Sequence, residues 1–246
     1  MIEIKYRGMC NNGRAPPIGC GENNQQSNQQ TGVVGIEQQE RRTMIRCNVT
    51  VCGVVSRVAT CRTNKDGQPF VTFAMNVVIS AKSGINKTIE VSVLKDGTLT
   101  EVGNIVTGQR IEVTGTLVPK KRGDALYFNM TATGINSDTG ATEDSIVGQM
   151  EFRGKVGRNI EEKQSKKGEP YLMFSAFSAE KVQDGFEYLW VRFVRFGKER
   201  EAWLIPGCKM TAKGEMELSV YNDRLGFSCK VDELAEYVPQ PYNPQN

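Results

Sequence analysis

The segment KDGQPFVTFAMNVVI, residues 65–79, decides the fold, because its pattern recurs once as KKGEPYLMFSAFSAE, residues 166–180. In both copies a basic, glycine-containing turn precedes a proline and a run of alternating apolar and small or polar residues. Such period-two runs, rich in β-branched and aromatic residues, predict strands. The same spacing of fourteen residues separates a pair of glycines in each copy: Gly53 and Gly67, Gly154 and Gly168. We therefore interpret the chain as one unit that was duplicated and then diverged.

Five strands are expected in each copy. The alternation covers residues 47–58, 69–79, 88–94, 110–118 and 125–133 in the first copy, and 151–160, 171–179, 188–196, 209–218 and 225–231 in the second. A helix between the third and fourth strands is indicated only in the second copy, at residues 198–204. Five strands with such a connection fit a small closed barrel of the oligonucleotide-binding (OB) type, whereas an immunoglobulin-like sandwich would need about seven. We predict an all-β chain with two tandem five-stranded OB-fold barrels.

Polar segments of low complexity separate these units. We expect a partly flexible N-terminal segment at residues 1–45, a first barrel at 46–136, a linker at 137–147, a second barrel at 148–238 and a flexible tail at 239–246. The first barrel region carries eleven Lys and Arg against six Asp and Glu, whereas the second carries fifteen of each. The two halves therefore differ electrostatically, although the net charge of the chain is only +3.

Composition argues against several classes of protein. No apolar run approaches the roughly 20 residues of a membrane helix, and the N-terminus lacks a signal-peptide core. We expect no membrane association and a cytoplasmic location, at a nucleoid or at a viral or plasmid replication site. The chain has no histidine, which removes the commonest general base and metal ligand.

The seven cysteines include no C-x-x-C pair, so we interpret them as reduced thiols. A zinc site formed by Cys10, Cys20, Cys47 and Cys52 is the alternative, but this spacing fits no zinc ribbon or knuckle. No clustered carboxylates and no nucleophile–base pair are evident. We therefore expect no enzyme activity, no cofactor and no metal.

The strongest local signal is WVRFVRFGK, residues 190–198. At strand spacing, Trp190, Arg192 and Phe196 share one face. Two large rings and a guanidinium would make a poor core, whereas they suit unpaired bases, which stack on rings while arginine contacts phosphate. The alternative is that Trp190 or Phe196 closes one end of a barrel.

At these residues the second copy resembles the bacterial single-stranded-DNA-binding protein family, over residues 147–231. The matching residues are Gly154, Gly168-Glu169-Pro170, Phe174, the spacing W-x-R-x-x-x-F-G-K from Trp190 to Lys198, and Gly214. The resemblance implies that Trp190 and Phe196 stack on bases, and that Arg192 and Lys198 lie near the nucleic-acid backbone. The first copy departs here, because residues 88–97 read TIEVSVLKDG. The acidic tail typical of the family is also missing from residues 239–246, so recruitment of proteins by a tail is not expected.

Other candidates for nucleic-acid contact lie on loops and on one further strand face. In the loop between the fourth and fifth strands, and just after it, the candidates are Lys120, Lys121, Arg122 and Tyr127 in the first copy and Tyr221 and Arg224 in the second. In the second copy, the loop between the first and second strands adds Lys163, Lys166 and Lys167, and the outer face of the second strand adds Tyr171 and Phe177. Simple solvated turns are the alternative for the charged loops. Phe73 and Phe174 are expected in the two cores.

Together these features predict a protein that binds and protects single-stranded DNA without strong sequence preference, in replication, recombination or repair. A homodimer would bring four barrels together, and replication proteins are candidate partners. RNA binding is one alternative, because stacking does not distinguish the two nucleic acids. A protein–protein adaptor in a replication or mobile-element complex is the other, and the departures of the first copy favour it for that half.

Overall fold

The computed structural model describes residues 45–81, 84–183, 185–197 and 199–238. The N-terminal segment before residue 45 and the tail from residue 239 lie outside the described residues, so the flexibility expected of both stays a prediction. The strands of the first half are β1 (Ile45–Thr63), β2 (Pro69–Ile79), β3 (Lys87–Asp96), β4 (Arg110–Arg122) and β5 (Ala125–Asn136). Those of the second half are β6 (Ser145–Gln164), β7 (Pro170–Val182), β8 (Gly185–Phe196), β9 (Lys209–Tyr221) and β10 (Arg224–Glu236). The all-β prediction is confirmed, and each predicted strand is present.

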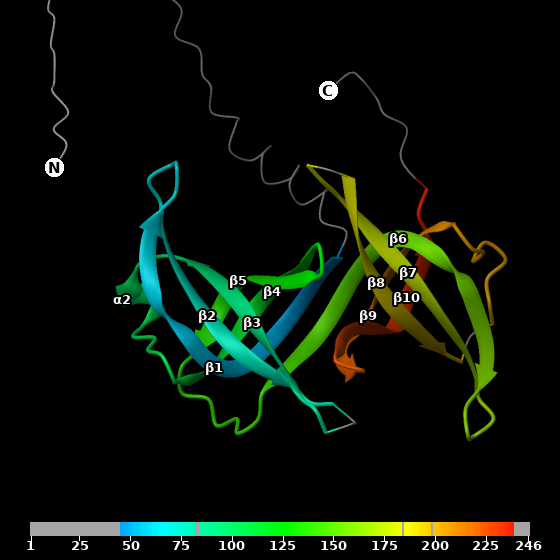
Figure 1. Cartoon of the computed structure of the whole chain (residues 1–246), viewed down its shortest axis with the longest axis horizontal. Coiled ribbons are helices and arrows are strands. Elements are labelled where there is room, and N and C mark those ends of the chain that lie inside the picture. The colour runs from blue at the N-terminus through cyan, green and yellow to red at the C-terminus, as the bar shows by residue number, and fades with distance from the viewer. Residues whose placement is uncertain (1–44, 82–83, 184, 198, 239–246) are drawn as a thin grey trace, which may run out of the picture. The chain divides into compact units, whose positions relative to one another are not determined.

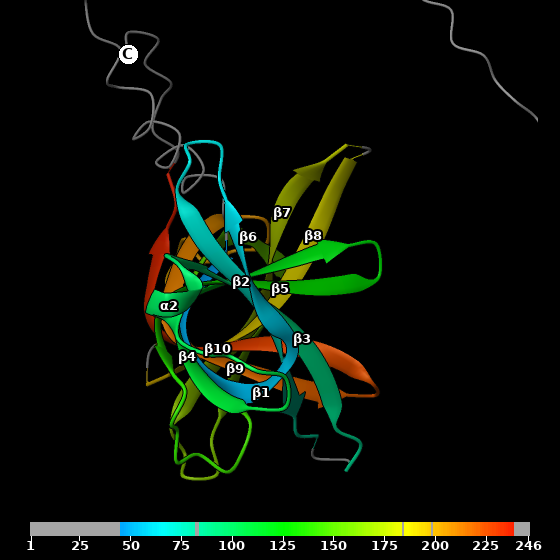
Figure 2. The same ribbon diagram turned by 90° about the vertical axis from the view of Figure 1, so that its left-hand side faces the viewer.

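Each half closes into a ring of hydrogen-bonded strands. In the first half the neighbours run β1-β2-β3-β5-β4 and back to β1, and in the second β6-β7-β8-β10-β9 and back to β6. The pairings β3–β5 and β8–β10 are parallel, and the other pairings within each ring are antiparallel. These rings are the two five-stranded barrels expected from the sequence. Figures 1 and 2 show the strands of the first barrel curving around its interior.

The glycines of the repeat occupy the same place in the two barrels. A β-carbon on Gly53 would lie 2.4 Å from the carbonyl oxygen of Asn76, and one on Gly154 would lie 2.2 Å from that of Phe177. Only a glycine allows a neighbouring strand to pass so close. Phe73 and Phe174 are both buried, as predicted.

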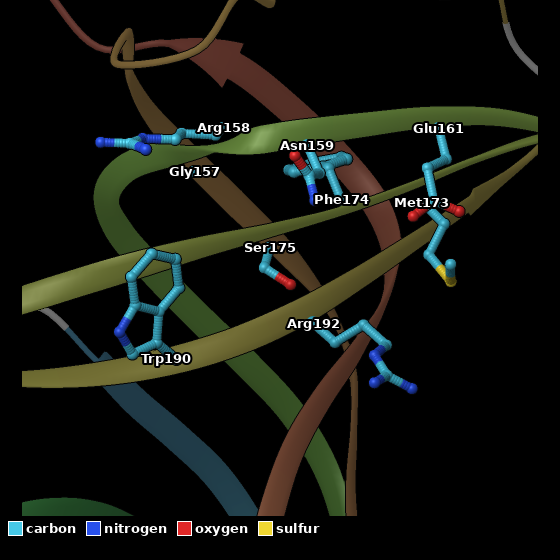
Figure 3. Close-up of a pocket in the computed structure, with 9 residues that line it drawn as sticks. All are labelled: Gly157, Arg158, Asn159, Glu161, Met173, Phe174, Ser175, Trp190 and Arg192. Atoms are coloured by element: carbon cyan, nitrogen blue, oxygen red, sulfur yellow. The ribbon is translucent and has the colours of Figure 1, made fainter.

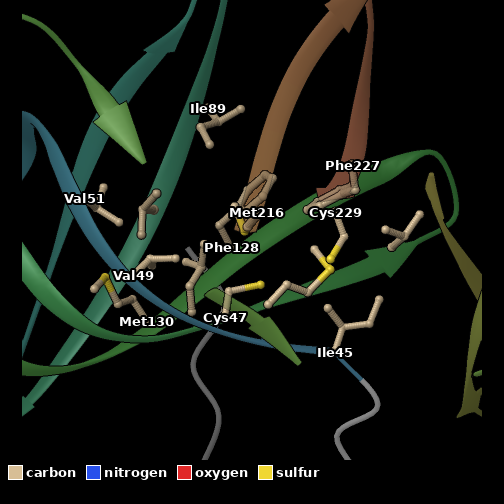
Figure 4. Close-up of a cluster of buried hydrophobic side chains, with 14 of the residues drawn as sticks. Ile45, Cys47, Val49, Val51, Ile89, Phe128, Met130, Met216, Phe227 and Cys229 are labelled. Atoms are coloured by element: carbon tan, nitrogen blue, oxygen red, sulfur yellow. The ribbon is translucent and has the colours of Figure 1, made fainter. Parts of the chain in front are cut away.

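The two barrels share backbone pairing and a core. β1 pairs with β6 over eight residues each, so that Asn48 lies opposite Gln149. The rings of Phe128 and Phe227, at equivalent places in β5 and β10, stack with centroids 6.0 Å apart. Buried apolar residues from both barrels meet around this pair (Figure 4). Equivalent elements therefore contact each other, as across an approximate two-fold axis.

Two expectations from the sequence need correction. Ser145 begins β6, although residues 145–147 were expected in the linker, because they pair with β1. The helix expected at residues 198–204 is wrong, since residues 199–204 form turns and irregular backbone. The described helix is α2 (Leu99–Val102) in the first barrel, where Thr98 and Glu101 form a capping box. None of the helical segments among the described residues is long and apolar enough to span a membrane.

The described cysteines are free thiols. Cys47 and Cys52 lie five residues apart in the regular part of β1, so their side chains point to opposite faces of the strand. Cys47 and Cys52 could therefore not both be ligands of one ion in the four-cysteine zinc site considered as the alternative. Cys10 and Cys20 lie outside the described residues.

Candidate nucleic-acid interface

The outward face of the β7–β8 hairpin carries five aromatic side chains. The strand register places Tyr171 opposite Phe196 and Phe177 opposite Trp190, with Tyr188 one pleat further along β8. Because side chains alternate across a strand, these rings lie on the face opposite to the buried Phe174 and Phe193. We call the set Tyr171, Phe177, Tyr188, Trp190 and Phe196 the ring face.

The three rings on β8 are exposed to solvent rather than enclosed by the barrel, and Tyr171 and Phe177 are half-buried. Trp190 is 52% exposed, Phe196 47% and Tyr188 46%. These values contradict the alternative in which Trp190 or Phe196 closes a barrel end. Hydrophobic rings of this size seldom stay exposed together without a ligand or partner to cover them.

The ring face contains two groups. Phe177 lies between Tyr188 and Trp190, with centroid distances of 5.5 Å and 4.9 Å. Tyr171 and Phe196 form the second group, with centroids 5.5 Å apart. Along the hairpin the groups are separated by the cross-strand pairs Met173–Val194 and Ser175–Arg192. The spacing leaves room for bases to stack at two places on one ribbon.

A groove of about 440 Å³ lies beside the first group (Figure 3). Its lining residues are Gly157, Arg158, Asn159, Glu161, Met173, Phe174, Ser175, Trp190 and Arg192. The β6–β7 register shifts between Val156 and Ile160, which brings Gly157 against the indole. A β-carbon on Gly157 would lie only 3.0 Å from Cζ3 of Trp190. The absence of a side chain at this position therefore lets the indole pack against the backbone of β6.

The groove carries cations suited to phosphate. Arg158 and Arg192 are exposed, and neither forms an ion pair with a described residue. The carboxylate of Glu161 is paired with Lys163 at 2.5 Å. Arg195, on the inward face of β8, is buried and paired with Glu201. The two guanidiniums at the groove thus remain available to an anionic ligand.

Four other predicted site residues of the second barrel lie in or beside its turns. Lys166 and Lys167 are exposed in the β6–β7 turn, and Arg224 is exposed beside the β9–β10 turn. Tyr221, the last residue of β9 before the same turn, is 77% exposed. Lys198 lies outside the described residues. Contact of these side chains with nucleic acid stays a prediction.

The predicted basic residues of the first barrel have acidic partners on the second. Lys120, Lys121 and Arg122 form ion pairs with Glu180 and Glu187, at the far end of the β7–β8 hairpin. Tyr127, on β5, is exposed. A direct role of these four residues in binding also stays a prediction.

The first barrel presents no equivalent of the ring face. Its register places Glu90 opposite Asn76 and Asp96 opposite Phe70, where the second barrel has Trp190 and Phe196. Arg57 donates a hydrogen bond to Glu90 at 2.8 Å. Apart from Phe70, which keeps a ring at the place of Tyr171, this half of the molecule therefore offers charge and small polar groups where the second offers rings.

Sequence reasoning missed several groove or ring-face residues, among them Gly157, Arg158, Ser175 and Tyr188. Tyr188 was detectable, because it lies two residues before Trp190 in an alternating strand and so shares its face. Ser175 was detectable in the same way, because it lies two residues before Phe177 on β7, whereas Gly157 and Arg158 face the site because of the shifted register of β6 against β7. A bulge of this kind depends on pairing between strands and leaves little local signal.

No protein-family model matches the chain, and no curated protein matches it. Among solved structures, the single-stranded DNA binding protein from Thermus aquaticus is similar over 80% of this chain and 95% of its own, at 16% identity and a TM-score of 0.40. A deletion mutant of that protein covers 81% and 98%, at 17% identity and a TM-score of 0.39. The protein PriB from Ralstonia solanacearum covers 37% and 97%, at 19% identity and a TM-score of 0.28.

Proposed function

We propose that this chain binds single-stranded DNA without strong sequence preference on the ring face of its second barrel. The observation that carries the proposal is the group of five rings on β7 and β8, of which the three on β8 are exposed, beside a groove with two arginines that form no ion pair with a described residue. Unpaired bases would stack on Phe177, Trp190 and the Tyr171–Phe196 pair. Arg158 and Arg192 would contact phosphates.

The mechanism is equilibrium binding without a chemical step. Stacking on an aromatic side chain contributes about 1–3 kcal/mol per base and tolerates every base. Binding should weaken as salt rises, because phosphate contacts release counterions. Duplex DNA should bind poorly, because its bases are already stacked on one another. These properties suit protection of single strands in replication, recombination or repair.

A fluorescence titration tests the proposal. In a Trp203→Phe background Trp190 is the remaining tryptophan, so oligo-dT should quench its emission, whereas a duplex of equal length should not. Trp190→Ala and Phe196→Ala, followed by filter binding or anisotropy of labelled oligo-dT, should each raise Kd roughly 5- to 150-fold, the equivalent of about 1–3 kcal/mol. Ile85→Ala, which removes an exposed apolar side chain of the first barrel, is the control. Unchanged affinity in both ring variants would remove the assignment of the site.

An RNA of the same length, oligo-rU, separates the two nucleic acids. Equal or tighter binding of oligo-rU would replace DNA with RNA as the ligand of the same face. The adaptor function finds its support in the first barrel, because Glu90 and Asp96 replace the stacking rings there. Failure of both oligonucleotides to bind at low salt would favour the adaptor for the whole chain.

We further propose that the chain forms a homodimer, which would bring four barrels together. Sedimentation equilibrium measures this directly, and a mass equal to one chain at micromolar concentration would exclude it. Replication proteins remain proposed partners.

A further inference from the structure

The β4–β5 hairpin of the first barrel contacts the β7–β8 hairpin of the second (Figure 2). Arg122 donates from Nη1 to Oε2 of Glu180 at 2.9 Å, and Nζ of Lys120 lies 3.8 Å from Oε1 of the same carboxylate. Hydrogen bonding to Arg122 also lowers the pKa of Glu180. Both oxygens of Glu180 are therefore engaged by the first barrel.

Glu187 makes a second set of contacts with the same hairpin. The backbone N–H of Gly123 donates to Oε1 of Glu187 at 2.9 Å, and Nζ of Lys121 lies 4.0 Å from Oε2. We call Lys120, Lys121 and Arg122 the basic tip, and Glu180 and Glu187 the acidic pair. Each cation of the basic tip thus faces a carboxylate of the acidic pair.

The acidic pair is unfavourable within its own hairpin. Glu180 and Glu187 lie directly opposite each other in the β7–β8 register. Like charges at directly opposed positions destabilise a pair of strands. Without an external cation, this repulsion would tend to separate β7 from β8 at the end of the hairpin.

The acidic pair lies on the reverse side of the ring face. Ala179 and Tyr188 are the next cross-strand pair after Glu180 and Glu187, and Phe177 and Trp190 follow two residues further on. Because side chains alternate across each strand, Glu180 and Glu187 point away from the side that carries Tyr188 and Trp190. The basic tip can therefore hold the hairpin from behind while the rings stay open to a ligand.

The matching contact on the other side of the approximate two-fold axis has the same polarity. There Lys87, at the start of β3, donates to the backbone oxygen of Asp223 at 2.7 Å, and its Nζ lies 3.4 Å from Oδ1. In both contacts the first barrel supplies the cations and the second supplies the anions. This agrees with the excess of basic residues in the first barrel.

We propose that the first barrel is a positioning element for the ring face: its basic tip neutralises the acidic pair and so fixes the hairpin that carries Phe177, Tyr188 and Trp190. This inference rests on the proposed function for its effect on DNA binding. It assigns Lys120, Lys121 and Arg122 an action through the acidic pair instead of a direct contact with phosphate.

The test is a cycle of variants in the full-length chain. The basic tip is removed by Lys120→Ser, Lys121→Ser and Arg122→Ser, and the repulsion is removed by Glu180→Gln with Glu187→Gln. Two readouts are taken: amide hydrogen exchange of the β7–β8 hairpin without DNA, and Kd for oligo-dT. The control is Arg57→Ser, which breaks the exposed Arg57–Glu90 ion pair within the first barrel.

Removal of the basic tip should accelerate exchange in the hairpin and raise Kd roughly tenfold, the equivalent of about 1.4 kcal/mol. Both changes should disappear in the glutamine background, where no repulsion is left to neutralise, and Arg57→Ser should cause neither. Equal weakening in both backgrounds would overturn the proposal in favour of direct contact between the basic tip and phosphate. Unchanged exchange after removal of the basic tip would also overturn it. Because exchange is measured without DNA, it decides the positioning role even if the chain binds no oligonucleotide.

Discussion

At the scale of single residues, Gly157 controls where the indole of Trp190 lies. A β-carbon there would lie 3.0 Å from Trp190 Cζ3 and 2.9 Å from the carbonyl oxygen of Ser175. Gly157→Ala should therefore push the indole away from β6 and change Trp190 emission in the Trp203→Phe background. The loss of oligo-dT binding free energy should be at most that of one stacked base, about 1–3 kcal/mol.

Gly134→Ala is the matched control, because Gly134 also lies in a strand but its β-carbon would meet nothing within 4 Å. Emission and affinity that stay the same in Gly157→Ala would show that the indole does not depend on this contact.

The reactivity of the thiols follows from burial at individual positions. Burial raises the pKa of Cys47 and of Cys229 to about 12, so at pH 8 almost none of either thiol is the reactive thiolate. Cys61 is exposed at the end of β1. Iodoacetamide at pH 8, read out by peptide mass spectrometry, should label Cys61 within minutes and leave Cys47 and Cys229 unmodified until the chain is denatured. Rapid labelling of Cys47 in the native chain would contradict its buried position.

At the scale of elements, the sequence predicted each strand of the part of the chain that the structure describes, because each barrel strand buries one face and so alternates clearly. It did not predict the pairing of β1 with β6, because these two strands are far apart in the sequence and the local pattern of a strand does not identify its partner. For the same reason Ser145 was placed in the linker. The short helix α2 was missed because its surroundings are rich in glycine, although residues 98–101 have the spacing T-x-x-E of a capping box.

The β1–β6 pairing depends on Gly148. A β-carbon at Gly148 would lie 2.2 Å from the carbonyl oxygen of Asn48, and its φ of +153° disfavours other residues. Gly148→Ala should therefore lower the free energy of unfolding by about 1–3 kcal/mol in a urea titration. Gly140→Ala, in the loop before β6 with nothing within 4 Å, should leave it unchanged within error. If the two variants were equally stable, the close approach of β6 to β1 would be wrong.

At the scale of the whole molecule, the part of the site that the sequence predicted is the part that alternation within a strand decides, for Tyr171 and Phe177 on β7 as for the residues of β8. Trp190, Arg192 and Phe196 share a face by alternation alone. The groove and the neutralised acidic pair arise only where β6, β7 and the first barrel come together. The basic tip is an example. Its sequence predicts contact with phosphate, whereas in the folded chain it is paired with Glu180 of the second barrel.

The shared core predicts that the two barrels unfold together. Phe128 and Phe227 stack across the junction, and buried residues of both barrels form one continuous cluster. Calorimetry should therefore show one transition whose calorimetric and van't Hoff enthalpies agree. Phe128→Ala and Phe227→Ala should each cost about 3–5 kcal/mol, with a coupling energy of about 0.5–1.5 kcal/mol in the double variant. Phe73→Ala should couple more weakly to Phe227→Ala than Phe128→Ala does, because among the described rings Phe128 is the one that stacks on Phe227. Two separate transitions in the unmodified chain would show that the barrels are independent units, and the first barrel could then not hold the ring face in place.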